Sequence, residues 1–313
     1  MDEHKMAVVG IGATGSVLAA ALLSKYPGTV LVGRRPDLGK ALKEKGIAIS
    51  GAIGYQAQVN NYCSNMAELK DLSPTLIFLC TKTFHLEHVL DELQNILMPG
   101  TKIISTQNGL GAEDLIADKF GDETAFRLSL NFGASLKGPG QVEVTFFNRP
   151  NHLGCLNAEN RELGLQIGNI LTDCGLDTEF VDDIKLFVWK KMIMKCTMAS
   201  ICAVTDRTIK ACLEYPPTRE IADACFQEAL SVARALGYDL GHDYLTQALG
   251  YLNKVGMHKD SMCYDIENKT QTEIDFLGGK VVEYGRDKGI ETPFYVTMTN
   301  LVKAIEDTYL KKL

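Results

Sequence analysis

The sequence lacks the features of a membrane-spanning, disordered or disulfide-bonded protein. No run reaches the ~18–20 consecutive apolar residues that a membrane helix needs, and an apolar stretch such as Leu76–Cys80 has the length of a strand. The nine cysteines are odd in number and form no Cys-x-x-Cys pair, which favours buried free thiols in a reducing compartment. Hydrophobic residues make up 46% of the chain and charged residues 23%, so a globular protein is expected.

A basic surface, a targeting segment and a metal site are also not expected. The formal net charge of -7 argues against nucleic acid or an anionic membrane as a partner. The start Met-Asp-Glu-His-Lys has neither the basic end nor the long apolar core of a signal peptide, so a cytoplasmic location is expected. Only His85 and His88 lie close together among the histidines, without a partner at a zinc-like spacing, and no metal site is predicted.

Strand and helix signals alternate through the first part of the sequence. The fully apolar Leu76–Cys80 is typical of a strand in a buried parallel sheet, and the alternation indicates βαβ units. We predict an α/β fold with an N-terminal Rossmann-like, doubly wound sheet. The predicted elements are strand Met6–Val9, helix Ser16–Ser24, strand Thr29–Gly33, helix Pro36–Lys45, strand Leu76–Cys80, helix His85–Leu97, strand Lys102–Thr106 and helix Glu113–Phe120.

Two further strand pairs are predicted beside this alternation. Ile47–Ile53 and Gln56–Tyr62 form a candidate β-pair across a glycine. Phe126–Leu136 and Gln141–Phe147 flank a Gly-Pro-Gly turn, and we expect them as antiparallel additions at the edge of the sheet.

The remainder of the chain carries only helical periodicity. We therefore predict two domains: residues 1–182 form a nucleotide-binding domain, and residues 183–313 form an all-helical substrate domain. A homodimer is a possible assembly of such a chain. The predicted helices are Ile184–Val204, Pro217–Leu236, His242–Asn253, Thr270–Lys288 and Pro293–Leu310.

A glycine motif follows the first predicted strand and opens the first helix. In Gly10-x-Gly12-x-x-Gly15, the first glycine permits a tight turn, the second lets a pyrophosphate approach and the third lets helix and strand pack. The phosphates would rest on N–H groups at the helix N-terminus. The motif predicts a dinucleotide site; an ordinary glycine-rich turn is the alternative. The site residues are Gly10, Ile11, Gly12, Ala13, Thr14 and Gly15.

Two arginines end the second predicted strand. An NAD enzyme usually has an acidic residue here to hold the ribose 2′-OH, whereas this chain has Arg34 and Arg35. A guanidinium fork suits the 2′-phosphate of NADP. We therefore predict NADP(H) as the cofactor, with Arg34 as the main contact and a solvated surface role as the alternative for Arg35.

Several further motifs occur in a characteristic order. They are Thr81-Lys82, Gln107-Asn108-Gly109-x-Gly111, Trp189-Lys190-Lys191, Ser261 twelve residues before Glu273, and Gly289-Ile290-x-Thr292-Pro293. In this order and spacing they resemble the ketopantoate reductase (2-dehydropantoate 2-reductase) family from about Lys5 to Ile305. The resemblance implies a Rossmann domain with a helical domain, and NADPH-dependent reduction of a branched 2-oxo acid in pantothenate and coenzyme A synthesis. Some relatives are NAD-dependent dehydrogenases of other D-2-hydroxy acids.

The resemblance also implies roles for individual residues. Lys191 matches the catalytic lysine, Glu273 the active-site glutamate, Ser261 a ligand of the substrate carboxylate, Asn108 the asparagine beside nicotinamide and substrate, Lys82 a lysine near the cofactor, and Arg34 the 2′-phosphate contact.

Each of these residues also has an ordinary structural explanation. Lys191, Lys82 and Glu273 could be solvated surface charges. Asn108 precedes a glycine, which is a common turn pair. Ser261 could be the N-cap of a helix.

The sequence departs from the family one and two turns after the catalytic lysine. Lys195 and Ala199 stand where the family usually has asparagines that contact substrate. Lys195 could contact a substrate anion such as a second carboxylate, or it could reach solvent. Ketopantoate is the leading predicted substrate; another 2-oxo acid, D-2-hydroxy acid oxidation, or a non-catalytic NADP(H)-binding regulator are the alternatives.

Overall fold

The computed structural model describes residues 4–310, and their contacts divide the chain into two compact units. The first unit runs to Gln107 and resumes over Ala112–Ile184. The second comprises Asn108–Gly111 and the chain from Lys185 onward. A four-residue loop from the first half of the sequence therefore belongs to the second unit.

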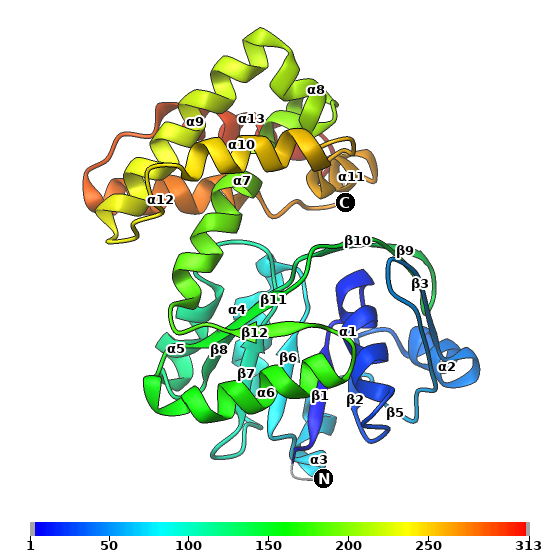
Figure 1. Cartoon of the computed structure of the whole chain (residues 1–313). Helices are drawn as coiled ribbons and strands as arrows, with labels where there is room; N and C mark the ends of the chain where they lie inside the picture. Colours follow the sequence, from blue (N-terminus) through cyan, green and yellow to red (C-terminus); the bar gives the residue numbers. More distant parts are fainter. Residues whose placement is uncertain (1–3, 311–313) are drawn as a thin grey trace. The chain divides into compact units, whose positions relative to one another are not determined.

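The first unit is built on an eight-stranded sheet (Figure 1). Neighbouring strands pair in parallel except β8 and β11, so β11 and its parallel neighbour β12 run opposite to the other strands. From β1 the order extends through β2 to β5 on one side and through β6, β7 and β8 on the other, which confirms the predicted doubly wound sheet. The order is β12 (Thr178–Phe180), β11 (Asn151–Cys155), β8 (Ala125–Ser129), β7 (Lys102–Ser105), β6 (Leu76–Leu79), β1 (Met6–Val9), β2 (Val30–Val32) and β5 (Asn61–Cys63).

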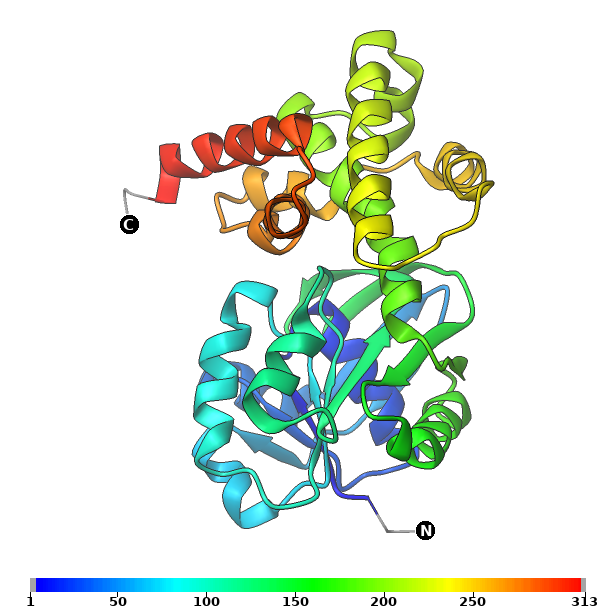
Figure 2. The same cartoon turned by 90° about the vertical axis from the view of Figure 1, so that its left-hand side faces the viewer.

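Helices cover both faces of this sheet, as Figures 1 and 2 show. Met6 and Val8 of β1 pack in one apolar cluster, and Ala7 and Val9 pack in the other. Burial on both faces explains why the strands contain continuous apolar residues. One cluster includes residues of α1 (Ala13–Leu23), α2 (Pro36–Lys45) and α6 (Arg161–Asp173); the other includes residues of α3 (Leu69–Leu72), α4 (Leu86–Gln94) and α5 (Ala112–Phe120).

A separate four-stranded sheet corrects the prediction for the Gly-Pro-Gly hairpin. The strand order of this sheet is β4 (Tyr55–Ala57), β3 (Ile47–Gly51), β10 (Gln141–Phe147) and β9 (Phe132–Gly138). The predicted β-pair is present as antiparallel β3 and β4, but its predicted second strand over 56–62 is too long, because β4 ends at Ala57 and Asn61–Cys63 form β5 of the large sheet. β9 and β10 are antiparallel as expected, but β10 pairs with β3 rather than with the edge of the large sheet. The predicted single strand over 126–136 is two strands that pair in different sheets: β8 in the large sheet, where it is fully buried, and β9 in the four-stranded sheet, where it is only partly buried.

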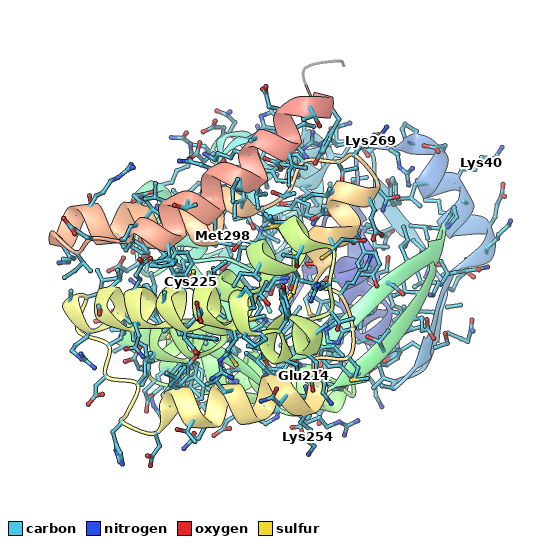
Figure 3. The ribbon with its side chains drawn as sticks, turned by 90° about the horizontal axis from the view of Figure 1, so that it is seen from above. Lys40, Glu214, Cys225, Lys254, Lys269 and Met298 are labelled. Atoms are coloured by element: carbon cyan, nitrogen blue, oxygen red, sulfur yellow. The ribbon has the colours of Figure 1, made fainter. Side chains whose placement is uncertain are left out.

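The second unit is helical, as predicted. Figure 3 shows Cys225 of α9 and Met298 of α13 inside this unit, while the charged Lys254 and Lys269 lie at its surface. Its helices are α7 (Ile184–Thr205), α8 (Ile209–Glu214), α9 (Pro216–Ala235), α10 (Tyr244–Val255), α11 (Ser261–Glu267), α12 (Gly278–Lys288) and α13 (Pro293–Leu310).

The predicted helix over Thr270–Lys288 is wrong in its first half, and α12 begins only at Gly278. The preceding segment contains a single 3₁₀ turn over Ile274–Phe276. Two of its backbone N–H groups donate to side chains: that of Thr272 to Oε1 of Glu306, and that of Ile274 to Oγ1 of Thr272. These bonds replace the i→i−4 bonds of a continuous helix.

The sequence also raised expectations about the cysteines, about membrane-spanning helices and about clusters of metal-binding side chains. All nine cysteines are free thiols. Within residues 4–310, no helix is long and apolar enough to span a membrane. The same residues contain no group of three or more His, Cys, Asp or Glu side chains that could hold a metal ion.

Candidate active site

The glycine turn joins β1 to α1 at the point of the sheet where the strand order reverses, the usual ligand site of a doubly wound sheet. A Cβ atom on Gly15 would lie 1.9 Å from the carbonyl oxygen of Gly10, so close packing requires glycine here. A Cβ atom on Gly12 would have no heavy atom of the described residues within 4 Å. Gly15 therefore serves the fold, and Gly12 leaves one side of the turn open.

The surroundings of this turn fit a dinucleotide. Within the described part of the chain, the N-terminus of α1 has neither a side-chain cap nor an acidic residue in its first turn, so its N–H groups remain available to a phosphate. The hydroxyl oxygens of Ser16 and Thr81 and the side-chain amide of Gln107 are buried there without a hydrogen-bond partner. These residues follow β1, β6 and β7, whose carboxyl ends lie at one edge of the sheet because the strands are parallel. A bound ligand could supply the missing partners.

Tyr62 holds the loop that carries Arg34, a contact that sequence reasoning missed. Its hydroxyl lies 3.1 Å from the carbonyl oxygen of Gly33 and 2.9 Å from that of Arg35, and its single hydrogen is shared between them. Burial raises the pKa of Tyr62, which keeps this donor protonated at neutral pH. The Arg34 side chain is exposed and free to meet a ligand phosphate from this supported loop.

The segment after β6 lies close to Arg34. Burial lowers the pKa of His85, and the nearby positive charge of Arg34 lowers it further. Lys82 is exposed at the N-terminal end of the 3₁₀ turn Thr83–His85. Arg34 and Lys82 therefore belong to neighbouring loops at one edge of the sheet.

A buried ion pair supports the segment that leads to Asn108. Nη2 of Arg127, on β8, donates to the carbonyl oxygen of Gln107 at 2.5 Å, and Nη1 donates to Oγ of Ser105 at 3.3 Å. Nη1 also lies 3.6 Å from a carboxylate oxygen of Glu113, and the two charged side chains are only 2% and 3% exposed. Sequence reasoning overlooked this pair, because no local pattern links a strand arginine to a glutamate fourteen residues earlier.

The loop Asn108–Gly111 packs against two elements of the second unit. The N–H of Gly109 donates to the sulfur of Met192 on α7 at 3.1 Å. The N–H of Leu110 donates to the carbonyl oxygen of Phe276 at 3.0 Å, three residues after Glu273. Both glycines of the loop have positive φ, +124° at Gly109 and +79° at Gly111, a backbone conformation that favours glycine. The segment therefore does form a turn, as the Asn-Gly pair indicated.

Asn108 has a contact beyond that turn. Nζ of Lys191, from α7, donates to Oδ1 of Asn108 at 3.1 Å. Glu273 is half-buried at the start of the 3₁₀ turn that contacts the same loop. Three residues singled out from sequence therefore lie on segments that the second unit packs together: α7, the 108–111 loop and the 273–277 turn.

Lys195 and Ser261 meet through a residue that sequence reasoning did not single out. Nζ of Lys195 lies 2.7 Å from both carboxylate oxygens of Asp260 and 2.8 Å from Oγ of Ser261. Asp260, not Ser261, is the N-cap of α11, and its Oδ1 accepts from the N–H of Met262 at 2.9 Å. The N-cap alternative for Ser261 is therefore wrong. An aspartate directly before Ser261 was the available signal.

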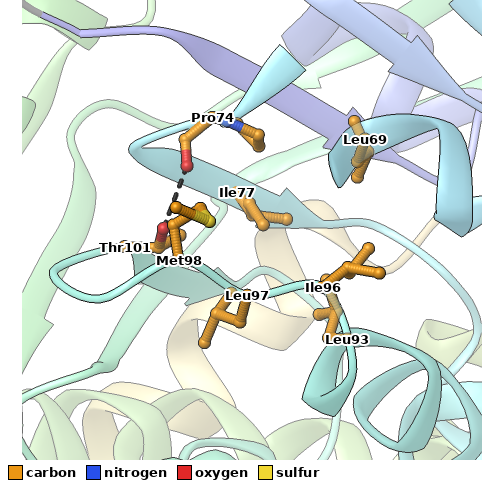
Figure 4. Close-up of a pocket in the computed structure, with 8 residues that line it drawn as sticks. All are labelled: Leu69, Pro74, Ile77, Leu93, Ile96, Leu97, Met98 and Thr101. Atoms are coloured by element: carbon orange, nitrogen blue, oxygen red, sulfur yellow. Dashed lines mark hydrogen bonds between the residues drawn. The ribbon is translucent and has the colours of Figure 1, made fainter. Parts of the chain in front are cut away.

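A small hollow elsewhere in the first unit is unsuited to a nucleotide (Figure 4). Pro74 and Thr101, which line it, lie within two residues of the first residues of β6 and β7, so it is at the amino ends of the strands, opposite the glycine turn. Thr101 Oγ1 donates to the carbonyl oxygen of Pro74 at 3.0 Å. The other lining residues are apolar: Leu69, Ile77, Leu93, Ile96, Leu97 and Met98.

The doubly wound sheet, the open glycine turn and the helical unit with its lysine–asparagine pair define a Rossmann-type oxidoreductase. Residues 6–158 match the family described as ketopantoate reductase PanE/ApbA, and residues 183–306 match its C-terminal part. The chain belongs to the ketopantoate reductase family, and the glycine turn supports a nicotinamide dinucleotide as its cofactor.

Individual relatives resemble the chain over nearly its whole length. The 2-dehydropantoate 2-reductase of Streptococcus pyogenes serotype M3 is 27% identical over 96% of this chain and 97% of its own. A D-mandelate dehydrogenase structure with NADH and anilino(oxo)acetate is 25% identical, with a TM-score of 0.88 over 97% of this chain and 99% of its own. A PanE/ApbA family ketopantoate reductase from Ralstonia eutropha JMP134 has the same fold, with a TM-score of 0.86 at 21% identity over 97% and 99% of the two chains.

Proposed function

We propose that the chain uses NADPH to reduce a 2-oxo acid, and that 2-dehydropantoate, converted to (R)-pantoate for pantothenate and coenzyme A synthesis, is its principal substrate. The observation that carries the proposal is the 3.1 Å hydrogen bond from Lys191 to Asn108. A lysine ammonium held by an amide oxygen is a ready donor for a ketone oxygen that becomes negative. The 27% identity to a 2-dehydropantoate 2-reductase over almost the full chain supports the substrate.

The protein side of the reaction follows from these residues. When bound, the reduced nicotinamide supplies the hydride that the ketone carbon receives. Lys191 stabilises the charge that develops on the ketone oxygen and donates a proton to it. Asn108 orients the ammonium through its Oδ1 atom. The exposed Ser261 hydroxyl binds the substrate carboxylate, and Glu273 helps to hold the substrate hydroxyl.

NADPH is proposed over NADH because of the loop after β2. Arg34 is exposed there on a segment held by Tyr62, and no acidic residue stands between Val32 and Pro36. Arginine offers a planar fork for a phosphate, whereas a ribose hydroxyl is normally held by a carboxylate. The solved D-mandelate dehydrogenase has NADH bound, and calorimetric titration of this chain with NADPH and with NADH tests the proposed preference.

A second candidate is reduction of a different 2-oxo acid, or oxidation of a D-2-hydroxy acid. It is favoured by Lys195 and Ala199, which replace the asparagines expected from the family, and by the similarity to a D-mandelate dehydrogenase. A non-catalytic NADP(H)-binding regulator is less well supported, because a regulator would not need both Lys191 and Glu273.

The test is NADPH oxidation, followed by absorbance, with a panel of 2-oxo acids that includes 2-dehydropantoate. The proposal expects 2-dehydropantoate to have the highest kcat/KM. A higher value for another 2-oxo acid supports the second candidate, and cofactor binding without turnover supports the regulator. Light scattering on the same sample tests the proposed homodimer.

A further inference from the structure

Lys195 forms a compact ion pair in the second unit. Its Nζ atom lies 2.7 Å from each oxygen of Asp260 and 2.8 Å from Oγ of Ser261. An ammonium group has three N–H donors, so these contacts use all of them. The side chains of Lys195 and Asp260 are 17% and 7% exposed, so water and salt screen this pair less than a surface pair.

The pair lies next to the proposed reaction centre. Lys195 follows Lys191 by four residues in α7, so the two side chains share one face of the helix about one turn apart. Ser261, beside Asp260, is exposed. Its oxygen accepts from Lys195, and its own hydrogen donates only at a long 3.5 Å to Oδ1 of Asp260, so a substrate carboxylate can compete for that hydrogen.

We propose, on the basis of the function proposed above, that Asp260 is a specificity-determining residue: by neutralising Lys195 it restricts the site to 2-oxo acids with a single carboxylate. The one carboxylate of such a substrate meets the Ser261 hydroxyl. A second carboxylate would meet an ammonium with no donor left and the negative charge of Asp260. The lysine in this position thus does not make the site a dicarboxylate site.

The substitution Asp260→Asn removes the negative charge that neutralises Lys195 and hardly changes the shape of the side chain. Asparagine is as good an N-cap as aspartate, so the bond to the N–H of Met262 and the start of α11 should be retained. The charge on Lys195 is then uncompensated. The matched control is Glu267→Gln, which removes a carboxylate that lies 2.8 Å from Lys259 in an exposed pair of the same unit.

The readouts are kcat/KM with NADPH, and affinity by calorimetry in the presence of NADP+. The two probes are 2-oxoisovalerate, a branched monocarboxylate, and 2-oxoglutarate, a dicarboxylate. Asp260→Asn should raise two ratios, kcat/KM and affinity for 2-oxoglutarate relative to 2-oxoisovalerate, by about 10–100-fold. This is the range of a charge-assisted hydrogen bond. The change should be mainly in KM. Glu267→Gln should leave the preference unchanged.

Two further variants separate charge from structural damage. In the double variant Lys195→Gln with Asp260→Asn, the two side chains again have no net charge, and the wild-type preference should be restored. Lys195→Gln alone leaves the negative charge of Asp260 and should disfavour 2-oxoglutarate further. If Asp260→Asn does not fold, the opposite shift in Lys195→Gln decides the question. An unchanged preference in a folded Asp260→Asn protein, or in Lys195→Gln, overturns the proposal. Absence of turnover in the wild type, together with a shift in affinity, would instead refute the reductase function and leave the role of Asp260 standing.

Discussion

Substitutions at two glycines of the β1–α1 turn should separate ligand binding from folding. A Cβ on Gly12 would meet no heavy atom of residues 4–310 within 4 Å, and the residue has an extended backbone with φ −87° and ψ −160° that alanine can adopt. A Cβ on Gly15 would overlap the Gly10 carbonyl oxygen at 1.9 Å. The same change, glycine to alanine, therefore adds a methyl group to open space at Gly12 but forces it against the backbone at Gly15.

Gly12→Ala should leave the protein folded. Glycine is a better N-cap than alanine, so we expect a loss of about 0.5–1 kcal/mol, which lowers Tm by only about 1–4 °C for a unit of this size. The new methyl group fills the space that a pyrophosphate would use, so affinity for NADPH should fall at least about tenfold. Gly15→Ala should cost about 1–3 kcal/mol or more, because helix and turn must move apart.

The assay is thermal unfolding of each variant with and without NADPH, supported by calorimetric titration. For Gly12→Ala we expect a nearly normal Tm that NADPH no longer raises. For Gly15→Ala we expect a lowered Tm before any ligand is added. Normal NADPH affinity in Gly12→Ala would refute the assignment of this turn as the phosphate site, and a normal Tm in Gly15→Ala would refute the packing argument.

Three further predictions concern the cofactor, the reaction and the buried ion pair. Arg34→Ala should narrow the preference for NADPH over NADH by about tenfold or more; equal affinities in the unmutated protein would contradict the proposed phosphate contact. Lys191→Ala should lower kcat by about two to four orders of magnitude with cofactor affinity retained, whereas Lys190→Ala should be nearly neutral, and the reverse result would shift the assignment by one residue. Arg127→Met should lower the free energy of unfolding in urea by about 3–5 kcal/mol, because it leaves the carboxylate of Glu113 buried without this cation; a loss below about 1 kcal/mol would show that the pair contributes little.

The sequence predicted those elements correctly whose structure depends on neighbouring residues in the chain. The alternation of apolar strands and helices predicted the doubly wound sheet, because strands buried on both faces must be apolar throughout. Pro36–Lys45 and Pro293–Leu310 begin and end as predicted, since a proline at the first turn marks a helix start locally. The β10 strand was also located correctly, but its partner was not.

The errors arose where a distant segment decided the outcome. The pairing of β10 with β3 joins strands about 90 residues apart, and the interrupted helix before Gly278 depends on the Glu306 side chain. Neither contact leaves a periodic signal in the chain, because pairing partners and side-chain competitors for the backbone are chosen by the tertiary structure.

The sequence by itself determined the chemical types of the candidate site: the glycine turn, the arginine after β2, and the lysine, asparagine and glutamate for which the family resemblance predicts roles. Only the tertiary structure decided how they combine. It brought Asn108 to Lys191 across 83 residues and Asp260 to Lys195 across 65 residues. The physical reason is that charge compensation depends on distances of a few ångströms between side chains, and those distances are set by helix packing and loop placement rather than by separation along the chain.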